Sequence, residues 1–195
     1  MGTMELACTE NTSLRSLTRG DAGSLLSVLS AGRSTLDPWL RWSGSILTLD
    51  SAHEFIARAA HQEATGRGFH LGLWRGDTLL GGLPCWSIDP VHRVAELGYW
   101  LAPESRGQGL ATRATHAVMD FLFTARAINR IEFQCRVENE PSRHLAERVG
   151  GRLEGIRRQS HYIAGAFRDH ALYAVLATDR PVRQQVTQKS VAASA

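Results

Sequence analysis

A glycine-rich segment at residues 106–112 has the residue types needed to bind a charged ligand. It reads Arg-Gly-Gln-Gly-Leu-Ala-Thr, follows an aromatic stretch at 98–101 and precedes an apolar helical pattern. The two glycines leave little side chain between the backbone N–H groups and a ligand. A helix start has about four unpaired N–H groups and a partial positive charge, and Arg106 adds a permanent charge with a planar set of donors. The segment is therefore predicted to bind a pyrophosphate.

Glycines precede a helix in three kinds of nucleotide-binding loop. A P-loop has Lys-Ser or Lys-Thr after its last glycine, whereas Leu110 and Ala111 stand there in this chain. A dinucleotide-binding fingerprint needs a glycine at the position of Thr112 and normally opens a series of βαβ units. The pattern Arg/Gln-x-x-Gly-x-Gly/Ala is met in full by Arg106, Gly109 and Ala111. At these residues the chain resembles the GNAT acetyltransferases, in which this loop wraps the pyrophosphate of coenzyme A.

Other segments narrow the resemblance to the RimJ/RimL branch, the acetyltransferases of protein N-terminal amines and their relatives. They are a strand pattern at 130–137, Asn-Glu-Pro-Ser at 139–142, two glycines at 150–151, Leu-Glu-Gly at 153–155 and Trp-Leu-Arg-Trp at 39–42. The match extends over nearly the whole chain. It implies an N-acetyltransferase that uses acetyl-CoA as cosubstrate and acts on a protein N-terminus or a small-molecule amine.

The order of expected elements agrees with the GNAT fold, a single α/β (α+β) domain over residues 1–178 with a flexible tail at 179–195. The expected strands are 14–17, 69–74, 78–88, 93–101, 130–137, 152–162 and 167–177, and helices are expected to begin near Asp21, Asp50 or Ser51, Leu110 and Pro141. These make a mixed, mostly antiparallel sheet of about seven strands flanked by helices. The resemblance implies a splay between two central parallel strands, 96–101 and 130–137.

The resemblance also implies where the cosubstrate binds. The pantetheine arm would lie in the splay, with backbone N–H groups near Trp100 and Leu101 binding it and the developing oxyanion. Asn139 stands where the family has an asparagine that hydrogen-bonds the pantetheine, although it also suits a turn ahead of a helix. The full set of expected contacts is Trp100, Leu101, Arg106, Gly107, Gln108, Gly109, Leu110, Ala111, Thr112 and Asn139.

Three residues are candidates for proton transfer. Ser142 occupies the position at which RimL-like enzymes carry a serine close to the thiol sulfur, so we expect it to protonate the thiolate; the alternative is that it caps the helix beginning at Pro141. RimL-like enzymes place a glutamate soon after Leu-Glu-Gly, and His161 stands there instead. A histidine can itself remove the amine proton. Glu96 is the other candidate base, acting through a water, unless it is only an exposed strand charge.

Aromatic residues are expected around the acceptor. Trp39 and Trp42 lie in a Pro-containing segment between two expected helices, where they either wall the acceptor pocket or pack in the core. For Trp86, core packing is the favoured interpretation.

The composition bounds the other possibilities. The chain has 195 residues, 43% of them hydrophobic, enough for one substantial core. Its three cysteines fit neither a zinc site nor a disulfide framework, which favours a cytoplasmic protein. The scattered arginines and net charge of +3 show no nucleic-acid footprint, no apolar run reaches the roughly 20 residues that span a bilayer, and no histidine pair has metal-ligand spacing. We therefore expect no metal, nucleic-acid or membrane partner, with a homodimer as one assembly to consider.

Two other functions stay open. A non-catalytic acyl-CoA-binding module could keep the fold and lose the base, because His161 stands where the family has an acid. A dinucleotide-dependent oxidoreductase is disfavoured by Thr112 and by the lack of repeated βαβ units. Comparing the binding of acetyl-CoA with that of NADH tests the oxidoreductase. Measuring thiol release with a panel of amines tests the non-catalytic module.

Overall fold

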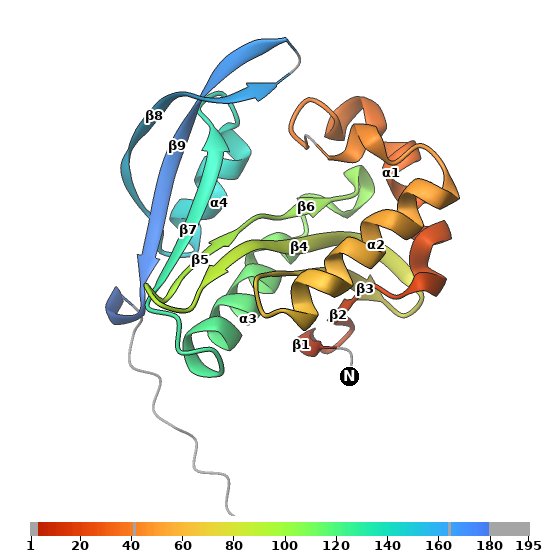
Figure 1. Ribbon diagram of the computed structural model, residues 1–195, viewed down its shortest axis with the longest axis horizontal. Coiled ribbons are helices and arrows are strands. Elements are labelled where there is room, and N and C mark those ends of the chain that lie inside the picture. The colour runs from red at the N-terminus through yellow and green to blue at the C-terminus, as the bar shows by residue number, and fades with distance from the viewer. Residues whose placement is uncertain (1–3, 41, 164, 180–195) are drawn as a thin grey trace, which may run out of the picture.

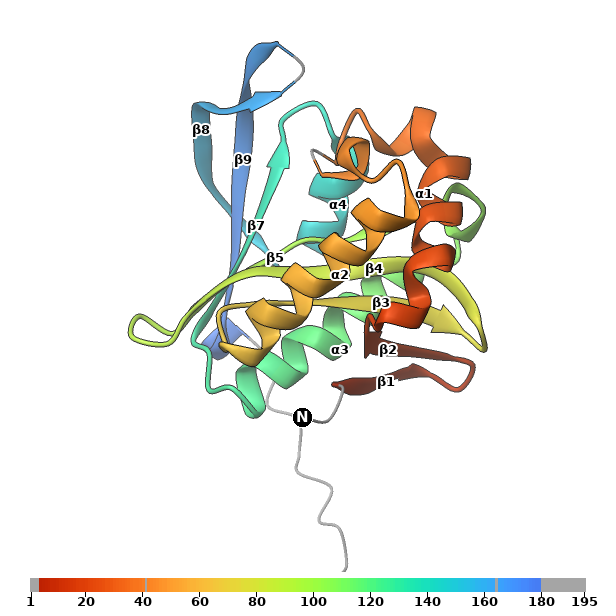
Figure 2. The same cartoon turned by 45° about the vertical axis from the view of Figure 1, so that its right-hand side comes forward.

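Helices cover both faces of one central sheet in the computed structural model of the chain (Figures 1 and 2), which describes residues 4–40, 42–163 and 165–179. Helices α1 (Ala22–Leu36) and α2 (Leu49–Ala64) pack on β3 and β4 from one side, whereas α3 (Leu110–Thr124) and α4 (Glu140–Arg148) lie on the other. The expected tail lies outside the described residues, apart from Asp179 in a final 3₁₀ turn.

The described residues contain nine strands in this sheet. They are β1 (Glu5–Thr9), β2 (Thr12–Ser16), β3 (Phe69–Arg75), β4 (Thr78–Asp89), β5 (Val94–Leu97), β6 (Trp100–Leu101), β7 (Arg130–Arg136), β8 (Arg152–Ile163) and β9 (Ala166–Leu176). Their order is β1-β2-β3-β4-β5-β7-β9-β8, with β6 paired to β4; β5 and β7 are parallel and the other pairs antiparallel. This is the mixed, mostly antiparallel sheet expected from the sequence. The two additional strands are β1, which precedes the first expected strand, and β6.

Strand β6 exists because the expected strand 93–101 is broken at Gly98 and Tyr99. Before the break, β5 pairs with β7 from Val94↔Arg130 to Leu97↔Phe133. After it, the chain follows β4 instead, since Gly98 N–H donates to the Pro84 carbonyl at 2.8 Å and Trp100 pairs with Gly82. Strand β7 continues beside β9. The expected splay between the parallel strands is therefore present, and it opens beyond Leu97 and Phe133.

Helices α1 and α2 begin close to the residues expected from the sequence. Asp21 precedes α1 as expected, but its carboxylate does not cap the helix; it accepts two hydrogen bonds of 2.8 Å from Arg15 and one of 2.7 Å from Thr18 N–H. Helix α2 begins slightly before the expected Asp50 or Ser51, because Thr48 is its N-cap and accepts from Ser51 N–H at 3.2 Å. The apolar pattern predicted both helices, and for α2 the Thr48 cap sets the first residue.

Two apolar cores fix the sheet between the helices. The core toward α3 and α4 includes Phe69, Leu83, Leu97, Val118, Leu122, Ile131, Phe133 and Tyr173. The core toward α1 and α2 includes Leu25, Leu29, Phe55, Ile56, Trp74 and Trp100. Because α1 and α2 pack on β3 and β4, they leave the face of β5, β7, β9 and β8 on that side uncovered (Figures 1 and 2).

One buried histidine gives the fold a pH dependence. His70 in β3 lies between the rings of Phe55 and Trp86, with ring centroids 5.0 Å away in each case. Burial lowers the pKa of His70 to about 4. Below pH ~6.5 the unfolded chain binds a proton that the folded chain does not, so stability falls as the pH drops, by about 3 kcal/mol at pH 4.

We expect His70→Leu to flatten this decline in stability between pH 6.5 and pH 4. Urea denaturation at several pH values measures it. The matched control is His61→Gln, because His61 is exposed on α2. A parental slope in the His70 variant would show that other groups cause the acid sensitivity.

Candidate functional site

A cavity of about 1200 Å³ lies at the splay. Its lining includes Leu36 at the end of α1, Trp39, Leu40 and Trp42 from the segment after it, and Trp86 from β4. It also includes Glu96 to Leu101 from β5 and β6, Arg106, Gly107 and Gly109 to Arg113 from the glycine loop and α3, Phe133 to Arg136 from β7, Asn139, Ser142 and Arg148 around α4, and His161, Ile163 and His170 from β8 and β9. Every expected site residue belongs to this lining except Gln108. The fold thus brings together residues spread over more than a hundred positions of sequence.

The glycine loop has the backbone conformation that its glycines allow. Gly107 and Gly109 have φ values of 75° and 67°, in the left-handed region that L side chains rarely adopt. Gly109 is the residue before α3, so the loop leads directly into the unpaired N–H groups of a fifteen-residue helix. This arrangement fits a pyrophosphate at the helix start.

Sequence reasoning missed one cation at this loop. Arg113 lies one turn into α3, where one guanidinium nitrogen donates to the Gln108 carbonyl at 2.6 Å and another is 3.0 Å from the place of a Cβ on Gly109. Its spacing of four from Gly109 placed it on the same helix face. Arg106, by contrast, reaches toward the Leu101 carbonyl and the Thr35 hydroxyl at 3.4 Å each.

Gln108 is expected to contact the cosubstrate, and this stays a prediction for its backbone. Its side chain turns away from the cavity: the amide nitrogen donates to the Glu104 carbonyl at 3.1 Å, and the amide oxygen accepts from Arg75 at 3.1 Å. These two bonds brace the outer side of the loop. Only the backbone of Gln108 is left to contribute to binding.

We expect Gly109→Val to weaken acetyl-CoA binding by roughly 30-fold or more, equivalent to about 2 kcal/mol. A β-branched residue is strained at φ 67°, and its side chain would fill the space between the loop and Arg113. Isothermal titration measures the dissociation constant. Gly76→Val is the control, since Gly76 has a φ of 54° with nothing within 4 Å of a Cβ and lies in the β3–β4 turn outside the cavity lining. An unchanged constant in the Gly109 variant contradicts the assignment of the loop.

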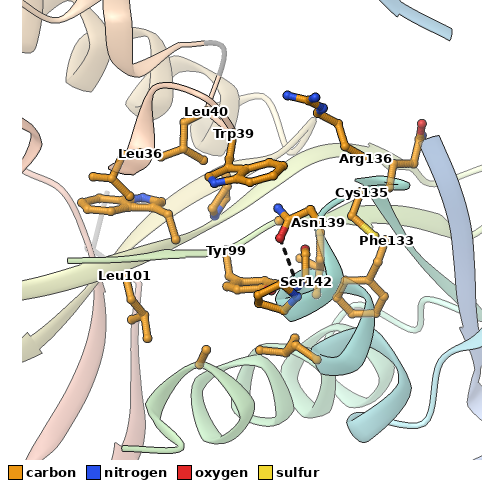
Figure 3. Close-up of a pocket in the computed structure, with 18 of the residues that line it drawn as sticks. Leu36, Trp39, Leu40, Tyr99, Leu101, Phe133, Cys135, Arg136, Asn139 and Ser142 are labelled. Atoms are coloured by element: carbon orange, nitrogen blue, oxygen red, sulfur yellow. Dashed lines mark hydrogen bonds between the residues drawn. The ribbon is translucent and has the colours of Figure 1, made fainter. Parts of the chain in front are cut away.

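The structure shows which residue caps helix α4. The Asn139 side-chain oxygen accepts from Ser142 N–H at 3.2 Å, so Asn139 is the N-cap (Figure 3). The capping role considered for Ser142 is therefore wrong, and its hydroxyl is left for the cavity. Asn139 also lines the cavity, so a second role toward a ligand stays a prediction.

The Ser142 hydroxyl lies beside Tyr99 and Cys135, two residues the sequence did not single out (Figure 3). Burial raises the pKa of Tyr99 to about 12 and that of Cys135 to about 11, while hydrogen bonding with Ser142 acts in the opposite direction on each. All three groups are therefore protonated at neutral pH. Tyr99 follows Gly98 at the strand break, and Cys135 lies on β7, so the two sides of the splay meet at Ser142.

Backbone donors also line the splay. Gly98 and Ala102 donate their N–H groups to the Pro84 and Leu80 carbonyls of β4. Because successive N–H groups of a strand point to opposite edges, those of Tyr99 and Leu101 point toward the splay. The expected donors were backbone N–H groups near Trp100 and Leu101, and the alternation assigns them to Tyr99 and Leu101. Trp100 instead packs its ring in the core beside Trp42, at 5.9 Å between centroids.

Glu96 stands on the open face of β5. It is half-buried and lies opposite Ser87 on β4 and Glu132 on β7. Burial raises the pKa of its carboxyl, the nearby Glu132 charge raises it further, and Arg157 acts in the opposite direction. A carboxylate with a raised pKa beside a cavity is suited to accept a proton near neutral pH.

His161 reaches the same cavity from the β8–β9 hairpin. The register of β8 shifts between Arg157 and His161, and Gln159 has a φ of 51° there. The His161 ring lies 3.9 Å from that of His170, and Ser160 Oγ is 3.0 Å from His161 Nδ1. Burial lowers the pKa of His170, and the neighbouring His161 lowers it further. The structure thus brings both candidate bases to one cavity.

Trp39 and Trp86 form part of the cavity wall, whereas Trp42 packs mainly in the hydrophobic core. Trp42 stacks on Phe55 at 4.8 Å, and its indole nitrogen is buried without a hydrogen-bond partner among the described residues, so it packs mainly in the core. Trp39 is 41% exposed, and the Arg136 guanidinium lies 5.1 Å from its ring, which makes it part of the wall. Trp86, expected in the core, also lines the cavity.

Within residues 4–40, 42–163 and 165–179, no group of three or more His, Cys, Asp or Glu side chains is arranged to hold a metal ion. In the same residues no helix has the length and apolar character needed to cross a membrane.

Comparison with known proteins identifies the fold and its relatives. The family described as "Acetyltransferase (GNAT) domain" matches residues 11–152. The chain is 31% identical over 168 residues to YdaF of Bacillus subtilis (strain 168), which is provisionally named a ribosomal N-acetyltransferase; the match covers 86% of this chain and 92% of YdaF.

Two solved acetyltransferase structures share the fold of this chain. RimJ of Mycobacterium smegmatis, in complex with CoA-disulfide, is 28% identical with a TM-score of 0.82, covering 92% of this chain and 88% of RimJ. RimL, a ribosomal L7/L12 alpha-N-protein acetyltransferase in complex with coenzyme A, has a TM-score of 0.85 at 22% identity, covering 89% of this chain and 98% of RimL. The likeness to RimL supports the fold.

Proposed function

The chain belongs to the GNAT acetyltransferase family, and from that premise we propose that it transfers an acetyl group from acetyl-CoA to the α-amine of a protein N-terminus. The observation that carries the proposal is the Ser142 hydroxyl, which is released from helix capping by Asn139 and lies at the splay with Tyr99 and Cys135. A group placed there can protonate a leaving thiolate.

The residues present fit acetyl-CoA. Left-handed Gly107 and Gly109 at the start of α3, with Arg106 and Arg113 beside them, suit the pyrophosphate. The splay beyond Leu97 gives the pantetheine a channel with backbone donors on one side. Acetyl-CoA would supply the activated acyl group as a thioester.

Each proton transfer then has a residue in place. Glu96, with its raised pKa, removes the proton from the amine, either directly or through a water. The N–H groups of Tyr99 and Leu101 stabilise negative charge on the acyl oxygen. Ser142 donates its proton to the thiolate and is reprotonated from Tyr99 or solvent.

An α-amine is the favoured acceptor for two reasons. Its pKa of roughly 7.7–8.0 asks less of the base than a lysine side chain near 10.4. The names of YdaF and RimL also refer to ribosomal-protein acetylation. An acceptor of this kind would place the protein in the cytoplasm.

Thiol release and mass spectrometry test the proposal. The protein is incubated with acetyl-CoA and with peptides, polyamines, antibiotics or aminoacyl nucleotides, and acetylated products are identified. We expect peptide N-termini to be acetylated faster than lysine side chains in the same peptides. Acetyl-CoA binding without thiol release for any amine would instead support the non-catalytic acyl-CoA-binding module.

A further inference from the structure

A row of basic side chains crosses the open face of the sheet beside the cavity. Arg136 on β7 lies directly opposite His170 on β9, which lies opposite Arg157 on β8. Residues paired across strands point to the same side, so these three share one face. Arg168 is two residues from His170 on β9 and lies on that face too, opposite His161 on β8.

Acidic groups in the described part of the chain offset only part of this charge. Arg136 has its Nε atom 3.4 Å from a Glu138 carboxylate oxygen. Arg157 donates to the neutral Gln134 side-chain oxygen at 2.7 Å, and the Arg168 Nε atom is buried without a hydrogen-bond partner among the described residues. Asp169, the next residue of β9, points to the other side and accepts from Gln159 N–H at 2.8 Å. The row therefore keeps an excess of positive charge.

The other end of the same face carries more carboxylates than guanidinium groups. Glu96 and Glu132 lie opposite each other on β5 and β7, and Arg130 is shared between Glu132, at 2.7 Å, and Glu154. Glu132 precedes Arg136 by four residues, which is roughly 13 Å along a strand at about 3.3 Å per residue. A ligand along this face therefore passes from an excess of carboxylates to the guanidinium groups of the row.

An extended peptide matches this polarity. With its α-amine near Glu96, its third and fourth residues would lie about 7 and 10 Å along the face, because an extended chain also advances about 3.3 Å per residue. The long arginine side chains of the row can span the remaining distance to an acidic side chain at either position. The face has room for such a chain, since it is open between the segment after α1 and the β8–β9 hairpin (Figure 2).

We propose that the Arg136–His170–Arg157 row, with Arg168, selects acceptor peptides that carry an acidic side chain at the third or fourth residue. The proposal rests on the proposed N-terminal acetyltransferase function and deepens it. Charge complementarity would act mainly on the Michaelis constant, because these groups lie away from the reacting atoms.

Two matched peptides test the proposal. One begins Ser-Ala-Asp-Asp, the other Ser-Ala-Asn-Asn, and both continue with the same neutral residues. We expect the acidic peptide to have a kcat/KM about five- to tenfold higher, from two exposed charge pairs. This preference should shrink as salt rises from about 50 mM to about 500 mM, since exposed pairs are screened.

Variants on β8 locate the effect. Arg157→Gln should reduce the preference to roughly twofold through KM, as expected from one lost exposed pair. Because Arg157 also lowers the pKa of Glu96, the two peptides are compared with each variant at one pH above the Glu96 limb, so that a change in that pKa affects both peptides alike. Arg158→Gln is the matched control, because Arg158 is also exposed on β8 but is not paired with a residue of the row. It should keep the parental preference.

The results of these experiments contradict different parts of the two proposals. Equal kcat/KM for the two peptides, or a preference that survives in an Arg157→Gln/Arg168→Gln protein, overturns this inference while leaving N-terminal acetylation intact. An aminoacyl nucleotide acetylated faster than both peptides overturns the peptide assignment. Absence of thiol release with every amine overturns the proposed function and this inference together.

Discussion

Replacement of Ser142 by alanine is expected to lower kcat by roughly 10²-fold, the lower range for loss of a proton-transfer group. Its hydroxyl lies between Tyr99 and Cys135, and the nearby helix is capped by Asn139. The hydroxyl is therefore available to the leaving thiolate, and its removal should leave acetyl-CoA affinity nearly unchanged. Steady-state kinetics with one acceptor peptide and titration with acetyl-CoA measure the two effects.

Asn139→Ala is the companion variant, because it removes the cap and keeps Ser142. It should lower the free energy of unfolding by about 1 kcal/mol, whereas Ser142→Ala should leave that free energy nearly unchanged. If Ser142→Ala lowers stability and turnover per folded molecule stays parental, the hydroxyl has a structural role and the assignment as acid fails.

The pairing of Asn139 and Ser142 shows where sequence reasoning reached its limit. Both residue types favour helix N-caps, and they stand three positions apart, so either assignment satisfied the pattern. The choice depends on which residue adopts the non-helical conformation. Asn139, with φ −85° and ψ 70°, does so.

The glycine loop was more predictable because its geometry is local. Left-handed conformations at Gly107 and Gly109 and a helix from Leu110 follow from adjacent residues. The direction of the Gln108 side chain was not predictable, since it is set by Arg75 and Glu104. Arg75 belongs to a different strand, and only the fold brings it to the loop.

The strand break at Gly98 and Tyr99 has a similar explanation. The alternation of 93–101 predicted one continuous strand. The chain leaves β7 there because Gly98 pairs with Pro84 of β4, and because the Trp86 indole lies 2.6 Å from the place where a side chain at Gly98 would begin. The break brings Tyr99 to the cavity, which is why sequence reasoning missed it.

The homodimer considered from the sequence stays a prediction.

Glu96→Gln is expected to lower kcat/KM by roughly 10²-fold, and His161→Gln by only a few-fold, as for a general base and a nearby polar residue. A base acts only when deprotonated, so the parental rate should rise with pH through the pKa of Glu96. Burial and the Glu132 charge place this pKa above its usual range. The pH profile of kcat/KM with one acceptor peptide measures the rise.

Glu132→Gln distinguishes the two bases further. Its carboxylate lies opposite Glu96 and raises the pKa of that group, so its removal should move the rise of the Glu96 limb to lower pH. The amine adds its own limb near pH 8, and this limb should not move. A limb that follows an imidazole, disappears in His161→Gln and does not respond to Glu132→Gln would assign the base to His161. If neither Glu96→Gln nor His161→Gln costs more than a few-fold, neither residue is the base, because the amine then reaches the site largely neutral and loses its proton to solvent.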